Sequence, residues 1–217
     1  MEGSRGLGDV YKRQLLDGAV KDKAVSKKYL SRANKGVERL IYLVKDLDFL
    51  TNLEQGNIRL DLNNFDIVVL INNVFEMMEI RSKKSNVRLE FDKDYNEPIL
   101  VHGDYERIQQ VLTNLIVNSI KYGTQGGKTE VRIQSFDKEK IIIRVKDNGE
   151  GIDDENLPRL FERFFRIDKS GNRKKGGSGL GLSIVKHIIE AHREQIFVES
   201  QLNVGSEFSF TLSKARI

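Results

Sequence analysis

Hydrophobic residues recur every three to four positions between Asp22 and Gln55, a spacing that predicts one long helix. The apolar stripe is wide enough for a helix that faces more than one neighbour in a bundle. Its members are Leu30, Ala33, Val37, Leu40, Ile41, Val44, Leu47, Leu50 and Leu53. Because the segment before Asp22 is short and irregular, we expect the partner of this helix to be missing from the chain or to lie in another subunit.

Beyond Gln55 the hydrophobic pattern changes to short alternating runs. Gly56 and Asn57 end the long helix, and strict alternation over 58–62 predicts a strand. Asp66 and Asp104 are placed to cap two further helices. The other predicted elements are helices over 66–84, from 104 onward and over 180–192, and strands near 87–91, 98–101, 130–135, 140–147, 196–199 and 207–212. This mixture predicts an α+β fold, a two-layer α/β sandwich with helices on one face, preceded by one long helix.

Changes in composition divide the chain into three parts. Residues 1–14 are Gly-rich and aperiodic, and we expect an unstructured or foreign leader there. Residues 15–57 contain the long helix, and residues 58–217 form the main domain.

Charge and composition narrow the classes of function. The chain has 217 residues and a net charge of only +4, from 36 basic and 32 acidic side chains spread along it, which favours a solvated surface over nucleic-acid binding. Cysteine is absent, which excludes disulfides and thiolate metal sites. The longest aliphatic run, 67–71, is far shorter than the ~20 residues of a membrane span. The N-terminus shows no secretory signal pattern.

The helix that follows Asp104 has a polar edge beside its apolar face. Asn114, Asn118, Lys121 and Tyr122 fall at positions i, i+4, i+7 and i+8, so they share one side of the helix. Asparagine is a middling helix former, so two of them on one edge lower the intrinsic stability of the helix. They are either ordinary surface decoration, or amide oxygens that bind Mg²⁺ beside a lysine for phosphates and an aromatic ring for a base.

Two glycine-containing segments follow. Asp147-Asn148-Gly149-Glu150-Gly151-Ile152 ends a strand, where its carboxylate could accept a hydrogen bond from an exocyclic amine or merely stabilise a chain-reversing turn. Residues 176–182 read Gly-Gly-Ser-Gly-Leu-Gly-Leu before an amphipathic helix, and the leucines interleaved with glycines favour a phosphate site made of backbone amides over a flexible linker.

Phe161-Glu162-Arg163-Phe164-Phe165-Arg166 lies between the two glycine segments. Either its phenylalanines clamp a mobile segment while the basic residues meet phosphates, or it is a solvated charged loop with a few core anchors.

Rival phosphate-binding motifs are excluded by their spacing. Tyr122 occupies the place of the first Walker glycine before Gly127, and Leu182 occupies the place of the last dinucleotide-binding glycine.

In this order, the four segments closely resemble the N, first glycine, F and second glycine boxes of sensor histidine kinases from two-component systems. Gly205-Ser206-Glu207-Phe208 is similar to the small glycine motif that closes their catalytic domain. The resemblance implies a Bergerat-type ATP-binding domain over 58–217. It also implies that residues 15–57 are part of the dimerisation and phosphotransfer domain, represented by one helix of its hairpin.

The resemblance implies ATP and Mg²⁺ as cofactors and assigns roles to single residues. Asn118 would ligate Mg²⁺, Asn114 would lie beside the phosphates, Lys121 would bind phosphate, and Tyr122 would lie against the nucleotide. Asp147 would accept a hydrogen bond from the adenine amine.

The remaining implied contacts come from the glycine boxes and the F box. Arg166 would approach the terminal phosphate and, with Asn114, is assigned a catalytic role. The adenine pocket and the phosphate-facing turn would be shaped by Gly149, Gly151, Ile152, Gly177, Ser178, Gly179, Leu180, Gly181 and Leu182.

The implied function is that of an ATP-dependent protein-histidine kinase. The terminal phosphoryl group would pass to a histidine of the dimerisation hairpin and then to an aspartate in the receiver domain of a response regulator. The intact protein would be a homodimer with this part in the cytoplasm and an anchor in the bacterial inner membrane. Two alternatives stay open: an ATP-binding regulatory module without phosphotransfer, and a gyrase- or chaperone-type ATPase, which typically has a glutamate where Asn114 stands.

This sequence departs from the family pattern at two places. The phosphoacceptor box is absent, and we assign structural or surface roles to His102, His187 and His192, so this chain should not autophosphorylate. Arg193 and Glu194 stand where the family often has a glycine pair, which should alter a turn and leave the chemistry unchanged.

Overall fold

The computed structural model describes residues 23–54, 59–167 and 178–216. The chain divides into two units, 1–46 and 47–217. Among the described residues, none of the helices has the length and apolar character that crossing a membrane requires.

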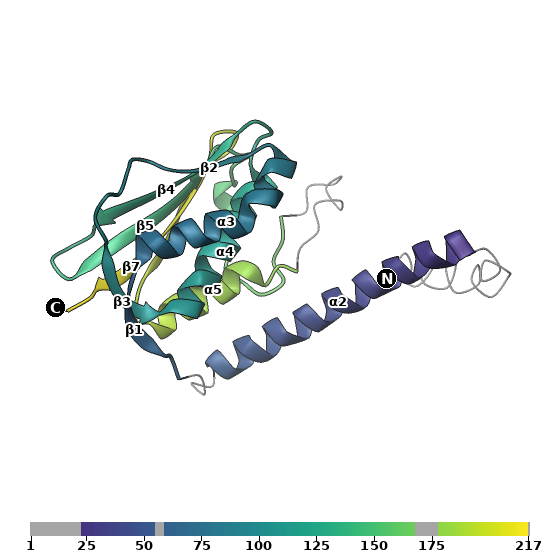
Figure 1. Ribbon diagram of the computed structural model, residues 1–217, viewed down its shortest axis with the longest axis horizontal. Coiled ribbons are helices and arrows are strands. Elements are labelled where there is room, and N and C mark those ends of the chain that lie inside the picture. Colours follow the sequence, from purple (N-terminus) through teal and green to yellow (C-terminus); the bar gives the residue numbers. More distant parts are fainter. Residues whose placement is uncertain (1–22, 55–58, 168–177, 217) are drawn as a thin grey trace. The chain divides into compact units, whose positions relative to one another are not determined.

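The long helix is confirmed as α2, Lys23–Glu54, which is 32 residues long (Figure 1). Its side chains keep the apolar stripe, but the large members of the stripe that the structure describes are between 40% and 66% exposed. These exposed members are Leu30, Val37, Leu40, Ile41, Val44 and Leu47. That a partner helix covers this stripe stays a prediction.

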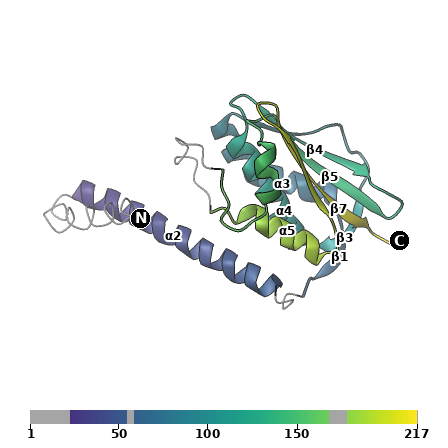
Figure 2. The same cartoon turned by 180° about the vertical axis from the view of Figure 1, so that it is seen from behind.

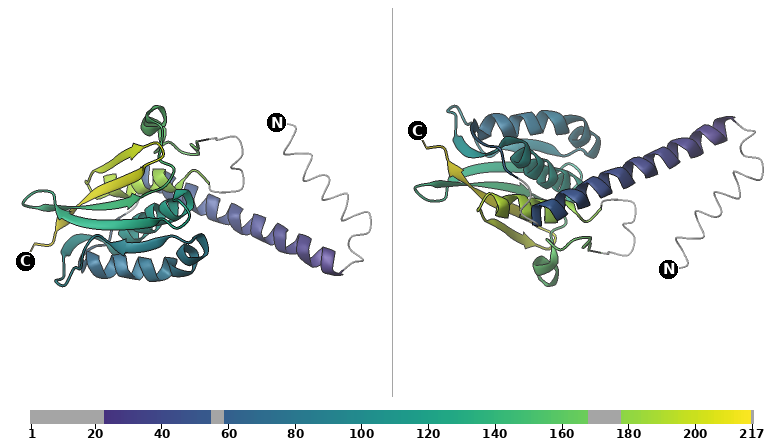
Figure 3. Two further views of the ribbon diagram at one scale, coloured as in Figure 1. Left: turned by 90° about the horizontal axis from the view of Figure 1, so that it is seen from above. Right: turned by 90° about the horizontal axis from the view of Figure 1, so that it is seen from below.

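From residue 59 onward, the described part of the second unit is an α+β sandwich of one mixed sheet, three α-helices and one 3₁₀ helix, which confirms the predicted fold class. Figures 1 and 2 show α3, α4 and α5 on the same face of the sheet, and the views along the layers in Figure 3 agree. The strand order is β1-β3-β7-β5-β4-β2, with β6 paired to β7. In chain order the elements are β1 (Leu62–Asp66), α3 (Ile67–Ser85), β2 (Arg88–Phe91), β3 (Leu100–Asp104), α4 (Tyr105–Tyr122), β4 (Lys128–Ser135), β5 (Lys140–Asp147), the 3₁₀ helix η2 (Asp154–Arg159), α5 (Gly181–Ala191), β6 (Ile196–Gln201) and β7 (Gly205–Lys214).

The core lies between the sheet and the helices, as the alternation along the strands requires. Ile143 of β5 pairs with Phe210 of β7, and both side chains are fully buried. The helices contribute their apolar faces, including Leu112 and Leu115 of α4 and Ile188 of α5, each at most 1% exposed. This packing fixes which edge of α4 turns away from the core.

The first strand of this unit was predicted over 58–62, and that placement is wrong, because β1 begins at Leu62. Asn63 and Asn64 are poor strand formers, so local propensity places the strand too early. Pairing with β3 sets where the strand lies, with Leu62 opposite Asp104 and Asp66 opposite Leu100. Tertiary pairing has overridden the sequence pattern here.

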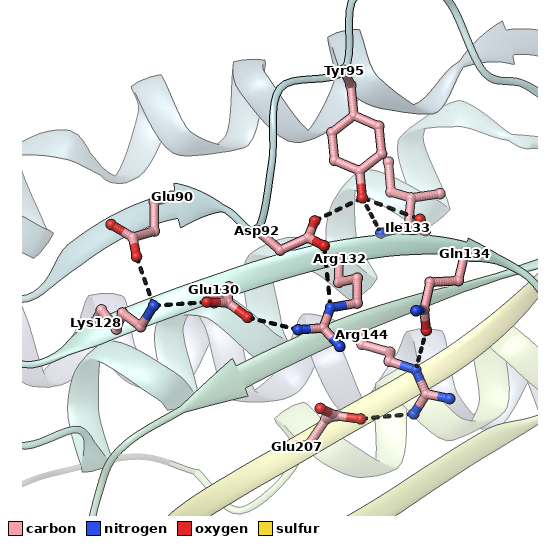
Figure 4. A network of polar contacts seen from close by, with 10 residues as sticks. All are labelled: Glu90, Asp92, Tyr95, Lys128, Glu130, Arg132, Ile133, Gln134, Arg144 and Glu207. Atoms are coloured by element: carbon pink, nitrogen blue, oxygen red, sulfur yellow. Dashed lines mark hydrogen bonds and ion pairs between the residues drawn. The ribbon is translucent and has the colours of Figure 1, made fainter.

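The opposite face of the sheet is covered by a charged network that joins β2, β4, β5 and β7 (Figure 4). Lys128 contacts Glu90 at 2.9 Å and Glu130 at 2.7 Å, and Arg132 contacts Glu130 at 3.2 Å. Hydrogen bonds to Glu130 and then to Glu90 raise the pKa of Lys128, and the bond from Lys128 lowers the pKa of Glu130. Burial raises the pKa of Tyr95 to about 12, and its hydroxyl accepts a hydrogen bond from the Ile133 N–H at 2.7 Å.

Candidate functional site

The polar edge predicted for α4 is present, with Asn114 and Asn118 half-buried beside the core face. The register of the helix is fixed by the Asp104 carboxylate, which accepts a hydrogen bond from the Arg107 N–H at 3.1 Å as the N-cap. At the other end, Lys121 Nζ lies 2.6 Å from the Tyr122 hydroxyl and 4.3 Å from its ring centroid. The two side chains therefore form one cationic, aromatic unit at the C-terminal end of α4.

The glycine-rich turn before α5 lies next to the first asparagine of this edge. A Cβ atom on Gly181 would lie 3.5 Å from Asn114 Oδ1. Among the described residues, the N-cap residue of α5, Leu180, makes no side-chain cap hydrogen bond, and backbone N–H groups at such a helix start are the kind that bind anions. Leu180 is buried and anchors the turn, while Ser178 Oγ accepts a hydrogen bond from the Leu180 N–H at 3.2 Å.

Asp147 at the end of β5 is a buried carboxylate, with only 7% of the residue exposed. Its Oδ1 atom accepts hydrogen bonds from the N–H groups of Gly149 at 2.8 Å and Ser206 at 3.3 Å. Among the described residues, both hydrogen bonds to this carboxylate go to Oδ1. Burial is the main cause that raises the pKa of Asp147, and the two backbone donors partly oppose it. The site thus has a fixed carboxylate with one oxygen still able to accept a hydrogen bond.

The loop after Asp147 passes so close to its neighbours that two glycines are required. A Cβ atom on Gly149 would lie 2.3 Å from the Tyr122 carbonyl oxygen, and one on Gly151 would lie 2.0 Å from the Gln201 carbonyl oxygen. Gly151 also has a φ of +65°, which favours glycine. Since the Glu150 N–H donates to the Tyr122 carbonyl at 3.2 Å, the loop and the end of α4 meet.

Sequence reasoning missed Ser200 and assigned no role to Ser206. Ser200 Oγ accepts a hydrogen bond from the Ile152 N–H at 2.8 Å and lies 2.8 Å from Ser206 Oγ. The alternation along β6 could have drawn attention to Ser200. It follows Ile196 and Val198 on the half-buried face of the strand, where an apolar residue is expected. Gly205 has a φ of +139° and would place a Cβ atom 2.1 Å from the Asp147 carbonyl oxygen.

The F segment contacts the glycine-rich turn through its backbone. The Phe164 N–H donates to the Gly179 carbonyl at 3.0 Å, and both residues have positive φ, 62° and 77°. Of the two alternatives for this segment, a clamp made by all three phenylalanines does not fit Phe164, which is 58% exposed. Phe165 instead lies under the Arg159 guanidinium, 4.5 Å from the ring centroid. Arg166 is exposed at the end of the described segment, and the predicted Gly177 lies outside the described residues.

The three histidines take structural or surface positions. His192 Nε2 accepts a hydrogen bond from the Asp104 N–H at 3.0 Å, and its Nδ1 lies 2.8 Å from the Ile188 carbonyl oxygen. Burial is the largest cause that lowers its pKa, and burial likewise lowers the pKa of His187. His102 is exposed, with Nδ1 2.9 Å from Asn64 Oδ1.

No group of three or more His, Asp or Glu side chains gathers as a metal site in the part of the chain that the structure describes. Asn118 remains the proposed protein ligand. An ion bound mainly by nucleotide phosphates and water needs only one or two oxygens from the protein, as Mg²⁺ commonly does. The amide chemistry of this edge is therefore compatible with that ion.

Comparison with known proteins gives consistent results. The family model described as "Histidine kinase-, DNA gyrase B-, and HSP90-like ATPase" matches residues 103–216. The chain is 32% identical over 204 residues to the sensor histidine kinase WalK of Bacillus subtilis (strain 168), which covers 93% of this chain and 33% of that protein. It therefore spans about a third of that relative.

Two solved structures share the fold. The histidine kinase AdeS of Acinetobacter baumannii superposes with a TM-score of 0.72 at 29% identity, covering 94% of this chain and 93% of AdeS. Full-length ShkA in complex with AMPPNP gives a TM-score of 0.77 at 25% identity, covering 88% of this chain and 40% of ShkA.

Proposed function

We propose that this chain binds Mg-ATP where α4, α5 and the loop after β5 meet, because it belongs to the family of histidine kinase-, DNA gyrase B- and HSP90-like ATPases. Within that family it is a histidine kinase catalytic region of a two-component sensor. In the whole protein, the terminal phosphoryl group of ATP passes to a histidine and then to a response-regulator aspartate. The similar ShkA structure, which contains AMPPNP, supports the nucleotide.

The observation that carries this proposal is the buried Asp147 carboxylate. With Oδ1 held by two backbone donors, Oδ2 accepts the hydrogen bond from the adenine amine. Gly149, Gly151 and Ile152 shape the wall of this pocket, and Tyr122 lies against the nucleotide. We call Asp147, the loop 148–152, Ser200, Gly205 and Ser206 the base side of the site.

The opposite half of the site, which we call the phosphate side, consists of the α4 polar edge, the N-terminal turn of α5 and Arg166. Asn118 holds Mg²⁺, which neutralises phosphate charge when bound, while Asn114 and Lys121 position the phosphates. Gly181 lies beside Asn114, and the first backbone N–H groups of α5 bind the same anion. The phosphate-binding turn extends through Gly177, Ser178, Gly179, Leu180 and Leu182, and Arg166 stabilises charge on the terminal phosphate.

The partners follow from this activity. The phosphoryl acceptor is a histidine-containing dimerisation hairpin in a homodimer, to which residues 15–57 contribute one helix, and the next acceptor is a response-regulator receiver domain. The catalytic part acts in the cytoplasm, and the intact protein is anchored in the bacterial inner membrane. This chain lacks the phosphoacceptor histidine box, so it phosphorylates only a histidine-containing hairpin that is supplied separately.

Calorimetric titration of Mg-ATP into the native chain and into Asp147→Asn tests the site. Asparagine has one oxygen, and the N–H groups of Gly149 and Ser206 require it, so the amide NH₂ would face the adenine amine. We expect the affinity for ATP to fall by a factor of about ten or more. The exposed Asp94→Asn is the matched control and should bind as the native chain does. Equal affinities for all three proteins would contradict the proposal.

Phosphotransfer is tested by adding a separate histidine-containing hairpin and labelled ATP. Acid-labile, alkali-stable label on the hairpin is the expected result. ATP binding without transfer would favour a regulatory module, and release of free phosphate would favour a gyrase- or chaperone-type ATPase despite the asparagine at position 114. Label on the chain alone would refute the expectation that it does not autophosphorylate.

A further inference from the structure

Ser200 is a polar residue in an apolar row. In β6 the residues Ile196, Val198 and Ser200 lie on the same face of the strand and are half-buried, while their neighbours along the strand are exposed. A hydroxyl in such a position costs free energy unless it is hydrogen-bonded. Its bonding partners therefore indicate why a serine stands there.

The hydrogen-bonding capacity of the Ser200 hydroxyl is fully used. Oγ accepts from the Ile152 N–H at 2.8 Å and donates to the Gly205 carbonyl at 2.9 Å. Ser206 Oγ lies 2.8 Å away. A hydroxyl has one hydrogen and two lone pairs. Because Ser200 donates its hydrogen to the Gly205 carbonyl, the Ser206 hydroxyl must donate to Ser200 Oγ. Ser200 thus joins the end of the loop after β5 to the start of β7.

Both ends of this junction lead to Asp147. The Ser206 N–H donates to Asp147 Oδ1 at 3.3 Å, and Gly205 packs against the Asp147 carbonyl oxygen. The loop that Ser200 holds through Ile152 begins at Gly149, whose N–H is the second donor to Asp147 Oδ1 at 2.8 Å. Both backbone donors to the carboxylate therefore belong to segments that the Ser200 hydroxyl ties together.

We propose that Ser200 is a positioning residue for nucleotide recognition. It fixes the two backbone donors on Asp147 Oδ1 and so directs Oδ2 toward the exocyclic amine of the base. This inference rests on the proposed role of Asp147 in binding adenine, and it adds a residue that determines how strongly the amine is recognised. Ser200 itself does not touch the nucleotide.

Calorimetry with two ligands tests this on the whole chain, using ATP and a purine nucleoside triphosphate that lacks the 6-amino group. The ratio of the two affinities measures recognition of the amine. In Ser200→Ala we expect ATP to bind about tenfold more weakly and the amine-free analogue to bind nearly as before, so the ratio falls by about tenfold. Ser200→Thr retains the hydroxyl and should retain the ratio.

Ser213→Ala is the matched control. Ser213 also lies on a strand and donates one hydrogen bond, to Glu194 Oε1 at 2.6 Å, but on another part of the sheet. It should lose stability and keep the native ratio. If Ser200→Ala does not fold, Ser200→Cys fills a similar volume with a much weaker hydrogen-bonding group and should lower the ratio.

Two results would overturn the proposal: an unchanged ratio in Ser200→Ala, or equal weakening of both ligands, which would indicate general loosening. Asp147→Asn separates this failure from failure of the proposed function. If Asp147→Asn loses the preference for ATP while Ser200→Ala keeps it, only the role of Ser200 is wrong. If Asp147→Asn keeps the native preference, the base-binding role of Asp147 is wrong, and with it the premise for Ser200.

Discussion

The base side and the phosphate side of the site differ in how firmly the fold holds them. On the base side, Asp147 is buried and its Oδ1 is bound by two backbone donors. On the phosphate side, Asn114 and Asn118 are half-buried and Arg166 is exposed. The base side is thus arranged before a nucleotide arrives, which lowers the ordering cost of recognition.

The backbone shows the same contrast. On the base side, positive φ falls on Gly151 and Gly205, where it costs little, and beside them on Asn203, a residue type that tolerates it. Beside the phosphate side, Phe164 has a φ of 62°, which costs a residue with a Cβ atom about 1 kcal/mol. We therefore expect the two sides to respond differently to substitution.

The largest expected effect is the loss of stability in Gly205→Ala on the base side. The new Cβ atom would lie 2.1 Å from the Asp147 carbonyl oxygen at a φ of +139°, so backbone must move. We expect unfolding in denaturant to show a loss of about 3 kcal/mol. On the phosphate side, Gly181→Ala meets Asn114 Oδ1 at an ordinary 3.5 Å and should change stability by less than about 1 kcal/mol. Similar unfolding midpoints for both variants would refute the contrast.

Sequence patterns predicted features set by local spacing better than features set by contacts between distant segments. The helix caps Asp66 and Asp104 and the asparagine edge of α4 depend on local spacing, and the structure shows each cap bond. The Ser200 junction depends on three segments that are distant in sequence, and no local pattern encodes such a meeting. The strand β1 was misplaced for the same reason, since its pairing with β3 outweighs the weak strand propensity of Asn63 and Asn64.

The second prediction concerns Mg²⁺ on the phosphate side. In Asn118→Ala we expect the affinity for Mg-ATP to fall about tenfold, because an amide oxygen ligand is lost. Binding of ATP in the presence of a chelator should stay near the native value, since the base side is intact. The exposed Asn72→Ala on α3 serves as the control. Equal weakening with and without Mg²⁺ would show that Asn118 contacts the nucleotide directly or supports the fold.

The third prediction is a pH dependence of stability that originates away from both sides, at His192. Only the neutral ring can accept the hydrogen bond from the Asp104 N–H, and burial lowers the pKa of His192 from its ordinary 6.5. Protonation therefore favours the unfolded chain. The stabilisation is complete above 6.5 and declines as the pH falls through the lowered pKa.

Thermal unfolding measured from about pH 8 to about pH 5 checks this, with His192→Gln for comparison. The variant should unfold at lower temperature near pH 8, since a hydrogen bond of about 1 kcal/mol is weakened, and should lose less stability on acidification than the native chain. Parallel pH profiles for the two proteins would exclude His192 as the origin. Nucleotide recognition at Asp147 should be unaffected near pH 8.

The smallest expected effect is a gain in stability in Arg193→Gly, at the turn where the family often has glycine. Arg193 has a φ of 60°, and the Glu194 N–H donates to the Ile189 carbonyl at 3.0 Å, the arrangement in which helices commonly end on glycine. Removing the Cβ atom relieves the left-handed strain but adds freedom to the unfolded chain, so we expect a net gain of up to about 1 kcal/mol in denaturant unfolding. ATP affinity should not change, because neither side of the site contains this turn. A loss of affinity would show that the turn after α5 is coupled to the phosphate side through the helix.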